Sequence, residues 1–288
     1  MNSVPRFFPR FRMASATAVT AGLLSVTFSG ESATLIRDSF DAYAAGPLSS
    51  PPTAGSPWIR HSGTGDNLLV QGGAVQLLQA DVVGNKDDAH QLFAGGAKFK
   101  PDGDADNGNN LIYASFGVVF TGLPTSAGGS YFAHLKADSA SEFYGRVWAG
   151  TEGADKIRLG ISGESAGNGV DAARLPQNLD LNVAYTVVTR LNVDTGVATL
   201  WVNPTSESDP GATSTDTWSF AGEIESFALR QGTTTPAGGV AAGGGSLLLD
   251  SLVVATTFAE VVPEPNGLTV MGGAILAVLL WREKRQKA

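Results

Sequence analysis

Short apolar runs separated by turn-forming residues fill the middle of the chain, and this punctuation limits the fold more than any other feature. Leu68–Val70 and Ala74–Leu78 flank the segment Gln71-Gly72-Gly73. A glycine pair between apolar runs is typical of a tight hairpin, because such turns need positive φ angles. No stretch repeats apolar residues at the 3.6-residue period of a long, capped helix. The pattern therefore predicts short antiparallel strands.

A second hairpin and several further strands follow the same pattern. Tyr185–Val193 and Val197–Val202 flank Asp194-Thr195-Gly196, with glycine where a left-handed residue is wanted. Glycine makes up 36 of the 288 residues, which suits a chain with many turns. The spacing predicts an all-β fold, an antiparallel β-sandwich with apolar inner faces. Further strands are expected at residues 111–120 (with a bulge at Gly117), 131–135, 143–148, 156–161, 224–230 and 247–254.

Composition excludes several functions. The chain has no cysteine, so it has no disulfide framework, no cysteine-ligated zinc and no thiol nucleophile. Residues 33–262 carry 12 Lys and Arg against 24 Asp and Glu, a net charge of −12. Such a body repels phosphate, which argues against nucleic acid or anionic lipid as a partner. Cations, polysaccharides and proteins remain as the classes of partner that the charge allows.

The first 32 residues have the order of a secretory signal peptide. Arg6, Arg10 and Arg12 form a basic region, and the uncharged run Met13–Phe28 follows. A cleavage zone then follows, with the small residues Ser29, Gly30, Ser32 and Ala33 and a cut expected after Ser29 or after Ser32. A run of 16 residues is short for a membrane span. An amphipathic helix is the alternative, but the run has no polar face.

The last 28 residues, 261–288, form a second segment outside the fold. Pro263-Glu264-Pro265 ends any strand, and Leu268–Trp281 follows as 14 uncharged residues. As a helix this run is about 21 Å long, which is marginal for a hydrocarbon layer of about 30 Å. We expect Trp281 to lie at the membrane interface. The basic residues Arg282, Lys284 and Arg285 should stop transfer and keep the end of the chain in the cytoplasm.

These features resemble the PEP-CTERM sorting signal of Gram-negative bacteria. The resemblance covers the motif Pro263-Glu264-Pro265, the short apolar helix and the basic terminus, together with the signal peptide at the other end. It implies export across the inner membrane, a membrane-anchored precursor, and handling by an exosortase that releases the body to the cell envelope or a biofilm matrix. A plain single-span anchor that is never cut is the alternative, and the physics of the segment does not separate the two.

Five phrases span most of the body, residues 33–260. They are Asp38–Tyr43, Arg158–Ser162, Leu200–Pro204, Phe227–Gln231 and Leu249–Val254. With these phrases the body resembles concanavalin A-like (LamG-type) jelly rolls found on PEP-CTERM proteins. The resemblance implies two curved antiparallel sheets. It implies no activity, because this fold hosts lectins, hydrolases and inert modules alike.

One acidic stretch suggests a calcium site. Asp102, Asp104 and Asp106 alternate and precede Gly108, and calcium takes such hard oxygen ligands. The glycine is one place late for an EF-hand loop, and Tyr113 stands where the bidentate Glu belongs. We favour a solvated acidic loop, and expect no cofactor. A calcium-dependent lectin is the hypothesis that the stretch leaves open.

Glu223 and Glu225 are the candidate catalytic pair. They stand two apart on an expected strand and so face one side, and glycoside hydrolysis needs two carboxylates. Concanavalin A-like glycanases add a third acid, which Ser226–Ala228 does not supply. An outward-facing polar pair is the simpler interpretation. A secreted glycan-active hydrolase that uses this pair is kept as the alternative function.

The remaining residues suggest no reaction. His61, His90 and His134 share no metal spacing, and His134 is expected as a satisfied buried or edge histidine. Trp148 and Trp201 are expected as buried aromatics, although with Trp58 and Trp218 they could instead form a sugar-stacking platform. The sequence thus predicts an exported jelly-roll module without enzymatic activity, structural or adhesive, with glycan contact. Its partners would be the exosortase, the secretion machinery, the membrane before processing, and polysaccharide.

Overall fold

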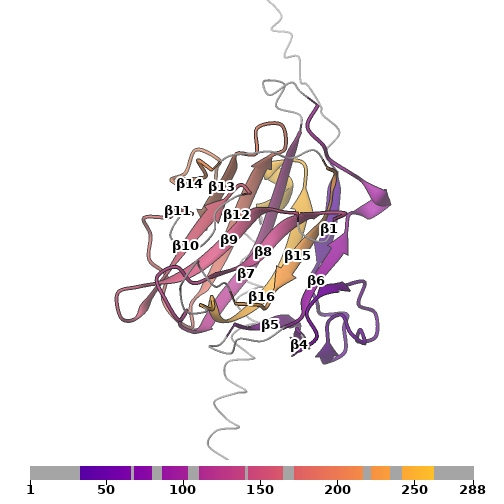
Figure 1. Cartoon of the computed structure of the whole chain (residues 1–288), viewed down its shortest axis with the longest axis horizontal. Coiled ribbons are helices and arrows are strands. Elements are labelled where there is room, and N and C mark those ends of the chain that lie inside the picture. The colour runs from indigo at the N-terminus through magenta and orange to yellow at the C-terminus, as the bar shows by residue number, and fades with distance from the viewer. Residues whose placement is uncertain are drawn as a thin grey trace, which may run out of the picture. The chain divides into compact units, whose positions relative to one another are not determined.

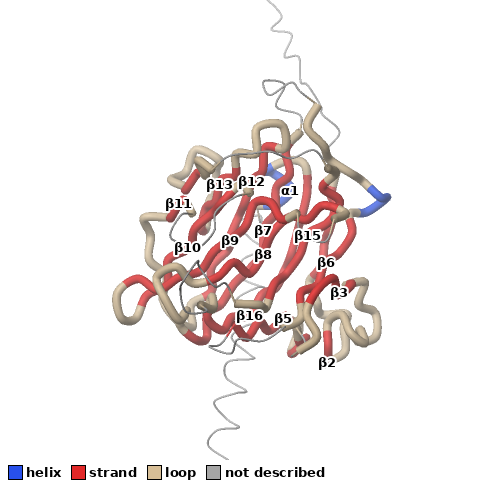
Figure 2. Tube along the Cα trace, in the orientation of Figure 1, coloured by secondary structure: helices blue, strands red, loops and turns tan. Residues whose placement is uncertain are grey.

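The fold is an all-β sandwich of two antiparallel sheets (Figure 1). The computed structural model describes residues 33–65, 68–79, 86–102, 110–139, 142–164, 172–216, 222–233 and 242–262. Helix is confined, within these ranges, to the one-turn segments η1 (Ala94–Gly96) and α1 (Phe258–Val261) (Figure 2). The fold class predicted from turn spacing is confirmed.

The larger sheet has nine described strands. Eight follow the order β14-β13-β12-β7-β16-β5-β4-β2, and β1 pairs with β16 beside them. They are β1 (Thr34–Asp38), β2 (Gly46–Pro47), β4 (Leu69–Gln71), β5 (Ala74–Gln79), β7 (Leu111–Gly122), β12 (Ala184–Asn192), β13 (Ala198–Val202), β14 (Ala212–Thr213) and β16 (Gly245–Ala255).

The smaller sheet has seven described strands in the order β11-β10-β9-β8-β15-β6-β3. Figure 1 shows its strands β10, β9, β8 and β15 side by side. They are β3 (Ile59–Ser62), β6 (Asp88–Leu92), β8 (Ser130–Ala137), β9 (Phe143–Glu152), β10 (Lys156–Ser162), β11 (Ala173–Arg174) and β15 (Ile224–Arg230).

The core lies between the two sheets and follows the period-two alternation of the strands. Phe116 and Phe120 of the larger sheet both meet Phe132 of the smaller one, with ring centroids 6.1 Å apart in each case. Ile157, Leu159 and Ile161 of β10 are all fully buried in the same cluster. Because alternate residues of a strand point to opposite faces, the residues between them form the outer face of each sheet.

The two predicted hairpins form as expected. Gly72 and Gly73 have φ angles of 61° and 77°, as the tight turn between β4 and β5 requires. Gly196 has φ 71° between β12 and β13. The predicted irregularity at Gly117 lies across from it instead: the register shifts in β16 between Asp250 and Val253, where Ser251 has φ 54°.

Several predicted features lie outside the described residues. They are the signal peptide at 1–32, the motif Pro263-Glu264-Pro265, the terminal residues Trp281, Arg282, Lys284 and Arg285, the aspartates Asp104 and Asp106, and Trp218. No helix in the described ranges is both long and apolar enough to cross a membrane.

Candidate functional site on the outer face of the smaller sheet

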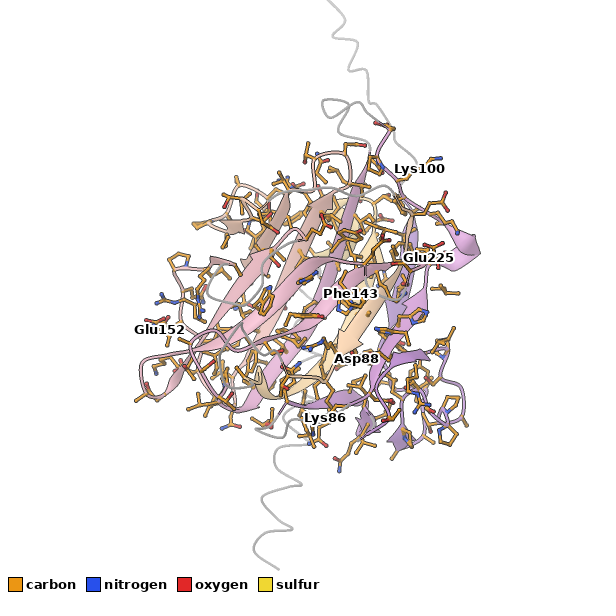
Figure 3. All side chains as sticks on the ribbon, viewed as in Figure 1. Lys86, Asp88, Lys100, Phe143, Glu152 and Glu225 are labelled. Atoms are coloured by element: carbon orange, nitrogen blue, oxygen red, sulfur yellow. The ribbon has the colours of Figure 1, made fainter. Side chains whose placement is uncertain are left out.

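The outer face of the smaller sheet brings together polar and aromatic side chains from five strands. Phe132, Ala133 and Leu135 of β8 fill the core, whereas Tyr131 of the same strand belongs to a separate cluster on the other face. Figure 3 draws the side chains on the ribbon, with Phe143 labelled near the middle of the view. The outer-face cluster, as we define it, consists of His61, His90, Tyr131, His134, Lys136, Phe143, Arg146, Trp148 and Arg230.

Strand register gathers all three histidines of the chain in this cluster. Ala228 of the central strand β15 pairs with His90 on one side and with His134 on the other. Ile59 in turn pairs with His90, and His61 stands two residues beyond it on β3. A methyl side chain at position 228 leaves open the space between the two flanking imidazoles. Positions 61, 90 and 134 therefore meet although no spacing in the sequence links them.

The histidine rings contact one another at the β3–β6 edge. The ring centroids of His61 and His90 are 5.2 Å apart, and those of His61 and His134 are 6.2 Å apart. The Nδ1 atoms of His61 and His90 are 3.3 Å apart. His134 is 1% exposed, and neither of its ring nitrogens has a hydrogen-bond partner. The expectation that His134 is buried is confirmed, but its hydrogen bonds are not satisfied.

Aromatic rings continue the cluster toward β9. The centroids of His134 and Phe143 are 4.7 Å apart, and those of Tyr131 and Trp148 are 5.1 Å apart. The indole Nε1 of Trp148 donates to Ser162 Oγ at 2.9 Å, which fixes the ring on the sheet. Trp148 and Trp201 are buried as predicted, but both lie on outer faces of the sheets rather than between them. Trp58 belongs to the central core.

Three cations surround His134. The guanidinium groups of Arg230 and Arg146 lie 4.2 Å and 5.3 Å from the centroid of the Tyr131 ring. The ammonium of Lys136, a residue only 5% exposed, donates to the carbonyls of Ala137 at 2.6 Å and Ser139 at 2.8 Å. Neutral carbonyl partners leave the charge of Lys136 in place. Three cationic side chains therefore lie together on a body whose net charge is negative, and Asp88, whose Oδ2 lies 4.0 Å from Arg230 Nε, pairs with one of them.

Burial keeps the imidazoles neutral at physiological pH. Loss of hydration, with His90 and Lys136 nearby, lowers the pKa of His61 to about 3. Burial lowers the pKa of His134 well below its usual value, and Arg146, Arg230 and Lys136 lower it further. The pKa of His90 is also lowered, mainly by burial, although the carboxylate of Glu225 opposes the change. The site thus offers uncharged ring nitrogens beside fixed positive charges.

This arrangement can bind an anion that also presents apolar surface. Guanidinium and ammonium groups attract carboxylate or sulfate, and a neutral imidazole can donate or accept a proton. Rings such as Phe143 give a flat surface for a sugar. His61, His90, Phe143 and Arg146 are only partly buried, so the cluster reaches solvent on these sides.

The predicted catalytic pair, Glu223 and Glu225, lies beside the outer-face cluster, and both carboxylates form ion pairs with one lysine. Lys98 Nζ is 3.1 Å from Glu223 Oε2 and 3.0 Å from Glu225 Oε2. The two carboxylates therefore lie on one side, as their spacing predicts, and a shared cation bridges them. Glu223 precedes β15, which begins at Ile224. The side chain of Glu225 is 21% exposed and that of Glu223 41%.

The predicted calcium loop is described only at its first residue. The backbone amide of Asp102 donates to Asp194 Oδ1 at 2.8 Å. That contact joins the start of the loop to the turn between β12 and β13. Asp104 and Asp106 lie outside the described residues. Across the described ranges, no group of three or more His, Cys, Asp or Glu side chains is placed to hold a metal ion.

Sequence reasoning missed the histidine cluster because two of its strands are weak in pattern. The segment Asp88–Leu92 that forms β6 is largely polar, and β3 is mostly exposed. The one available signal was chemical: the chain has only three histidines, and His134 stands in an apolar strand. A buried histidine without a fixed partner suggests a site more strongly than spacing does.

Comparison with solved structures finds similar folds in glycan-related proteins. Alginate lyase Aly36B is similar with a TM-score of 0.46 and 10% identity over 76% of this chain and 95% of that one. The CBM2 module of the evolved Dit of Lactobacillus casei BL23 phage J-1 gives a TM-score of 0.41, 9% identity, and coverage of 78% and 96%. Alginate lyase A1-II′, of polysaccharide lyase family 7, gives 0.38, 12%, and 66% and 82%. No protein-family model and no curated relative matches the sequence.

These similarities concern the fold, and they correct one expectation. The prediction that the body has no enzymatic activity is contradicted, because the similar structures include alginate lyases. It rested on the lack of a recognisable catalytic motif. Function depends on a site carried by the fold rather than on the fold itself, so the lack of one recognisable motif does not exclude activity.

Proposed function

We propose that this protein binds an acidic polysaccharide on the outer face of its smaller sheet. The observation that carries the proposal is the convergence of Lys136, Arg146 and Arg230 around His134. Three cations gathered on a body with twice as many acidic as basic residues concentrate positive potential in one place. Uronic acid or sulfated sugars supply the matching charge.

The aromatic residues of the cluster support a sugar rather than a simple anion. Tyr131 stacks against two guanidinium groups, and Phe143 packs on His134 at 4.7 Å. A pyranose ring presents one apolar face, which packs on such rings, while its carboxylate reaches the cations. The cluster follows β6, β15, β8 and β9 across the sheet, so a chain of several sugars can run over it.

The binding test compares two arginines in similar local settings. Arg146 lies over Tyr131 in the cluster, whereas Arg190 lies over Trp201 at 5.6 Å on the outer face of the larger sheet. We expect Arg146→Gln to weaken binding of alginate by about tenfold, since a charge-assisted hydrogen bond contributes about 1.5–3 kcal/mol. Arg190→Gln should stay within about twofold of the wild type.

Isothermal titration calorimetry with alginate and with a neutral β-glucan measures both effects. The proposal requires binding of alginate to exceed binding of the glucan, and the preference to shrink in Arg146→Gln. Equal affinity for the two polymers, or equal losses in the two arginine variants, would contradict it.

Cleavage of that polysaccharide is a second candidate function, favoured by the contact of Tyr131 with His134. Their ring centroids are 5.5 Å apart, and His134 is neutral because burial lowers its pKa. Both ring nitrogens of His134 are covered in the free protein, so a uronate must first displace the side chains above them. The neutral imidazole can then take the proton next to the carboxylate while the phenol protonates the departing oxygen. Nearby arginines would stabilise the charge that develops on the carboxylate.

The ultraviolet absorbance of an unsaturated uronate measures such an elimination. We expect Tyr131→Phe to abolish the signal while the affinity for alginate falls less than threefold, because the ring and its cation contacts remain. A wild-type protein that binds alginate but produces no absorbance would leave binding as the function and remove the lyase.

We further propose that the protein is exported and sorted through its ends. The support is the signal-peptide pattern of residues 1–32 and the terminal pattern of 261–288, whose partner would be an exosortase in the inner membrane. Intact-mass analysis of the mature protein from its native cell tests this. Loss of both ends is expected; a full-length chain recovered from the cytosol would overturn it.

A further inference from the structure

The imidazoles of His61 and His90 already have the separation of two ligands of one metal ion. They stand on the paired strands β3 and β6, and β3 is the last strand in the order of the smaller sheet. Their Nδ1 atoms are 3.3 Å apart. Two nitrogens bound to one tetrahedral ion at about 2.0–2.1 Å lie about 3.3–3.4 Å from each other.

The environment keeps both rings in the form that binds a metal. A ligand imidazole must be neutral, and burial lowers the pKa of both rings. The His90 ring also has a hydrogen bond with the backbone of Ile59. Metal-binding histidines usually donate their second ring nitrogen to such a carbonyl, which orients the ring and makes the free nitrogen more basic.

The separation of the two Nδ1 atoms exceeds that of an ordinary hydrogen bond. It is 3.3 Å, against the usual 2.7–3.2 Å. The Nε2 atom of His61 is buried without a partner whether the two Nδ1 atoms share a proton or a metal ion, so only the separation distinguishes the two arrangements.

The charged groups around His61 and His90 include carboxylates that attract a metal cation as well as ammonium and guanidinium groups that repel it. The carboxylate of Glu225 acts on His90, and Asp88 stands two residues before His90 on the same face of β6. Lys136 opposes a cation at both rings. Arg146 and Arg230 act on His134, farther into the sheet. The β3–β6 edge is thus the less positive end of the cluster.

We propose that His61 and His90 chelate one divalent transition-metal ion through their Nδ1 atoms, with water at the remaining positions. The described residues bring no third His, Cys, Asp or Glu ligand to the same point, so the site is a two-imidazole chelate. Imidazole ligands favour copper, nickel and zinc, with Cu²⁺ bound most tightly. His134 stays outside the metal shell.

The test titrates the untagged full chain with Cu²⁺ and, separately, with Zn²⁺ in a buffer that does not bind metals. We expect one Cu²⁺ per chain, an electron paramagnetic resonance spectrum with two coupled nitrogens, and a thermal midpoint that rises with Zn²⁺. His61→Gln and His90→Gln should each weaken Cu²⁺ binding by about tenfold or more and abolish the Zn²⁺ shift.

His134→Gln is the matched variant, because it removes the third histidine and leaves the pair. It should keep the two-nitrogen spectrum and an affinity within about twofold of the wild type. Circular dichroism of each metal-free variant confirms that the fold is retained. The proposal fails if the wild type shows no saturable Cu²⁺ binding, if the pair variants bind as the wild type does, or if His134→Gln loses as much affinity as they do.

Discussion

Asp250 is a buried carboxylate at the irregular position of β16. It is 5% exposed, and its Oδ1 accepts the amide of Ser251 at 2.5 Å. Burial, together with the carboxylates of Asp41 and Asp38, raises the pKa of Asp250 to about 6, although hydrogen bonds from the backbone and side chain of Ser251 oppose the change. In the unfolded chain an aspartate has a pKa of about 3.9. The folded state therefore binds more protons than the unfolded state between these two values.

The free energy of unfolding should consequently fall as pH rises from about 4 to 6 through Asp250, and the loss should be complete above pH 6. Asp250→Asn keeps the shape and removes the charge. We expect it to stabilise the protein by about 1–2 kcal/mol at pH 7 and to have almost no effect at pH 4. Urea unfolding of wild type and variant at both values measures the difference.

Asp155→Asn serves as the control, since the side chain of Asp155 is 77% exposed. It should change stability by less than about 0.5 kcal/mol at either pH. An Asp250→Asn protein less stable than wild type at pH 7 would show that the carboxylate is needed in its charged form.

Single residues could be predicted from the sequence where burial alone decides their state. Trp148 and Trp201 are large and apolar, and both are buried as expected. The state of His134 depends instead on what the adjacent strands place around it. The sequence near position 134 does not indicate that the charges of Arg146 and Arg230 act on His134. It also does not indicate that both ring nitrogens are buried without a hydrogen-bond partner.

At the scale of elements, α1 closes the outer face of the larger sheet. Phe258 packs edge-on against Tyr113 at 6.2 Å and against Trp201 at 5.9 Å between ring centroids. Val261 is 1% exposed in the same cluster. Burial of these rings holds the chain to the sheet up to Val262, the last described residue. The helix therefore ties the end of the body to its two longest strands, β7 and β16.

Phe258→Ala should destabilise the protein by about 1–3 kcal/mol, because it removes a partly buried ring that contacts two aromatic residues. Val183→Ala, at a position 42% exposed, should cost less than about 0.5 kcal/mol. Urea unfolding followed by far-ultraviolet circular dichroism compares the two. Equal and small effects would mean that α1 does not contribute to the stability of the sandwich.

The long strands could be predicted from the sequence, and the short ones could not. Apolar runs such as 111–120 and 247–254 correspond to β7 and β16, because both faces of these strands are largely buried. Strands β3 and β6 carry His61 and His90 at an edge, where one face meets solvent and the apolar signal is lost. Two of the five strands that carry the candidate site therefore lack a sequence pattern.

At the scale of the whole molecule, the sandwich is closed by its first and last strands. Thr34 of β1 pairs with Ala255 of β16, so contacts close a loop of more than 200 residues. One apolar cluster contains buried residues of β1 and β16 together with the inward-facing residues of both sheets. Pairing over such separations is visible only in the folded structure, which is why the sequence indicates the class of fold but not the order of its strands.

Because one core joins both sheets, unfolding should be a single transition. The midpoints of urea unfolding from tryptophan fluorescence and from far-ultraviolet circular dichroism should coincide. Leu35→Ala in β1, where the side chain is 4% exposed, should lower both midpoints together at a cost of about 2–4 kcal/mol. Leu69→Ala, 37% exposed in β4, is the control and should shift neither by more than about 0.5 kcal/mol. A Leu35→Ala protein in which one signal changes and the other does not would show that β1 opens independently of the rest of the sandwich.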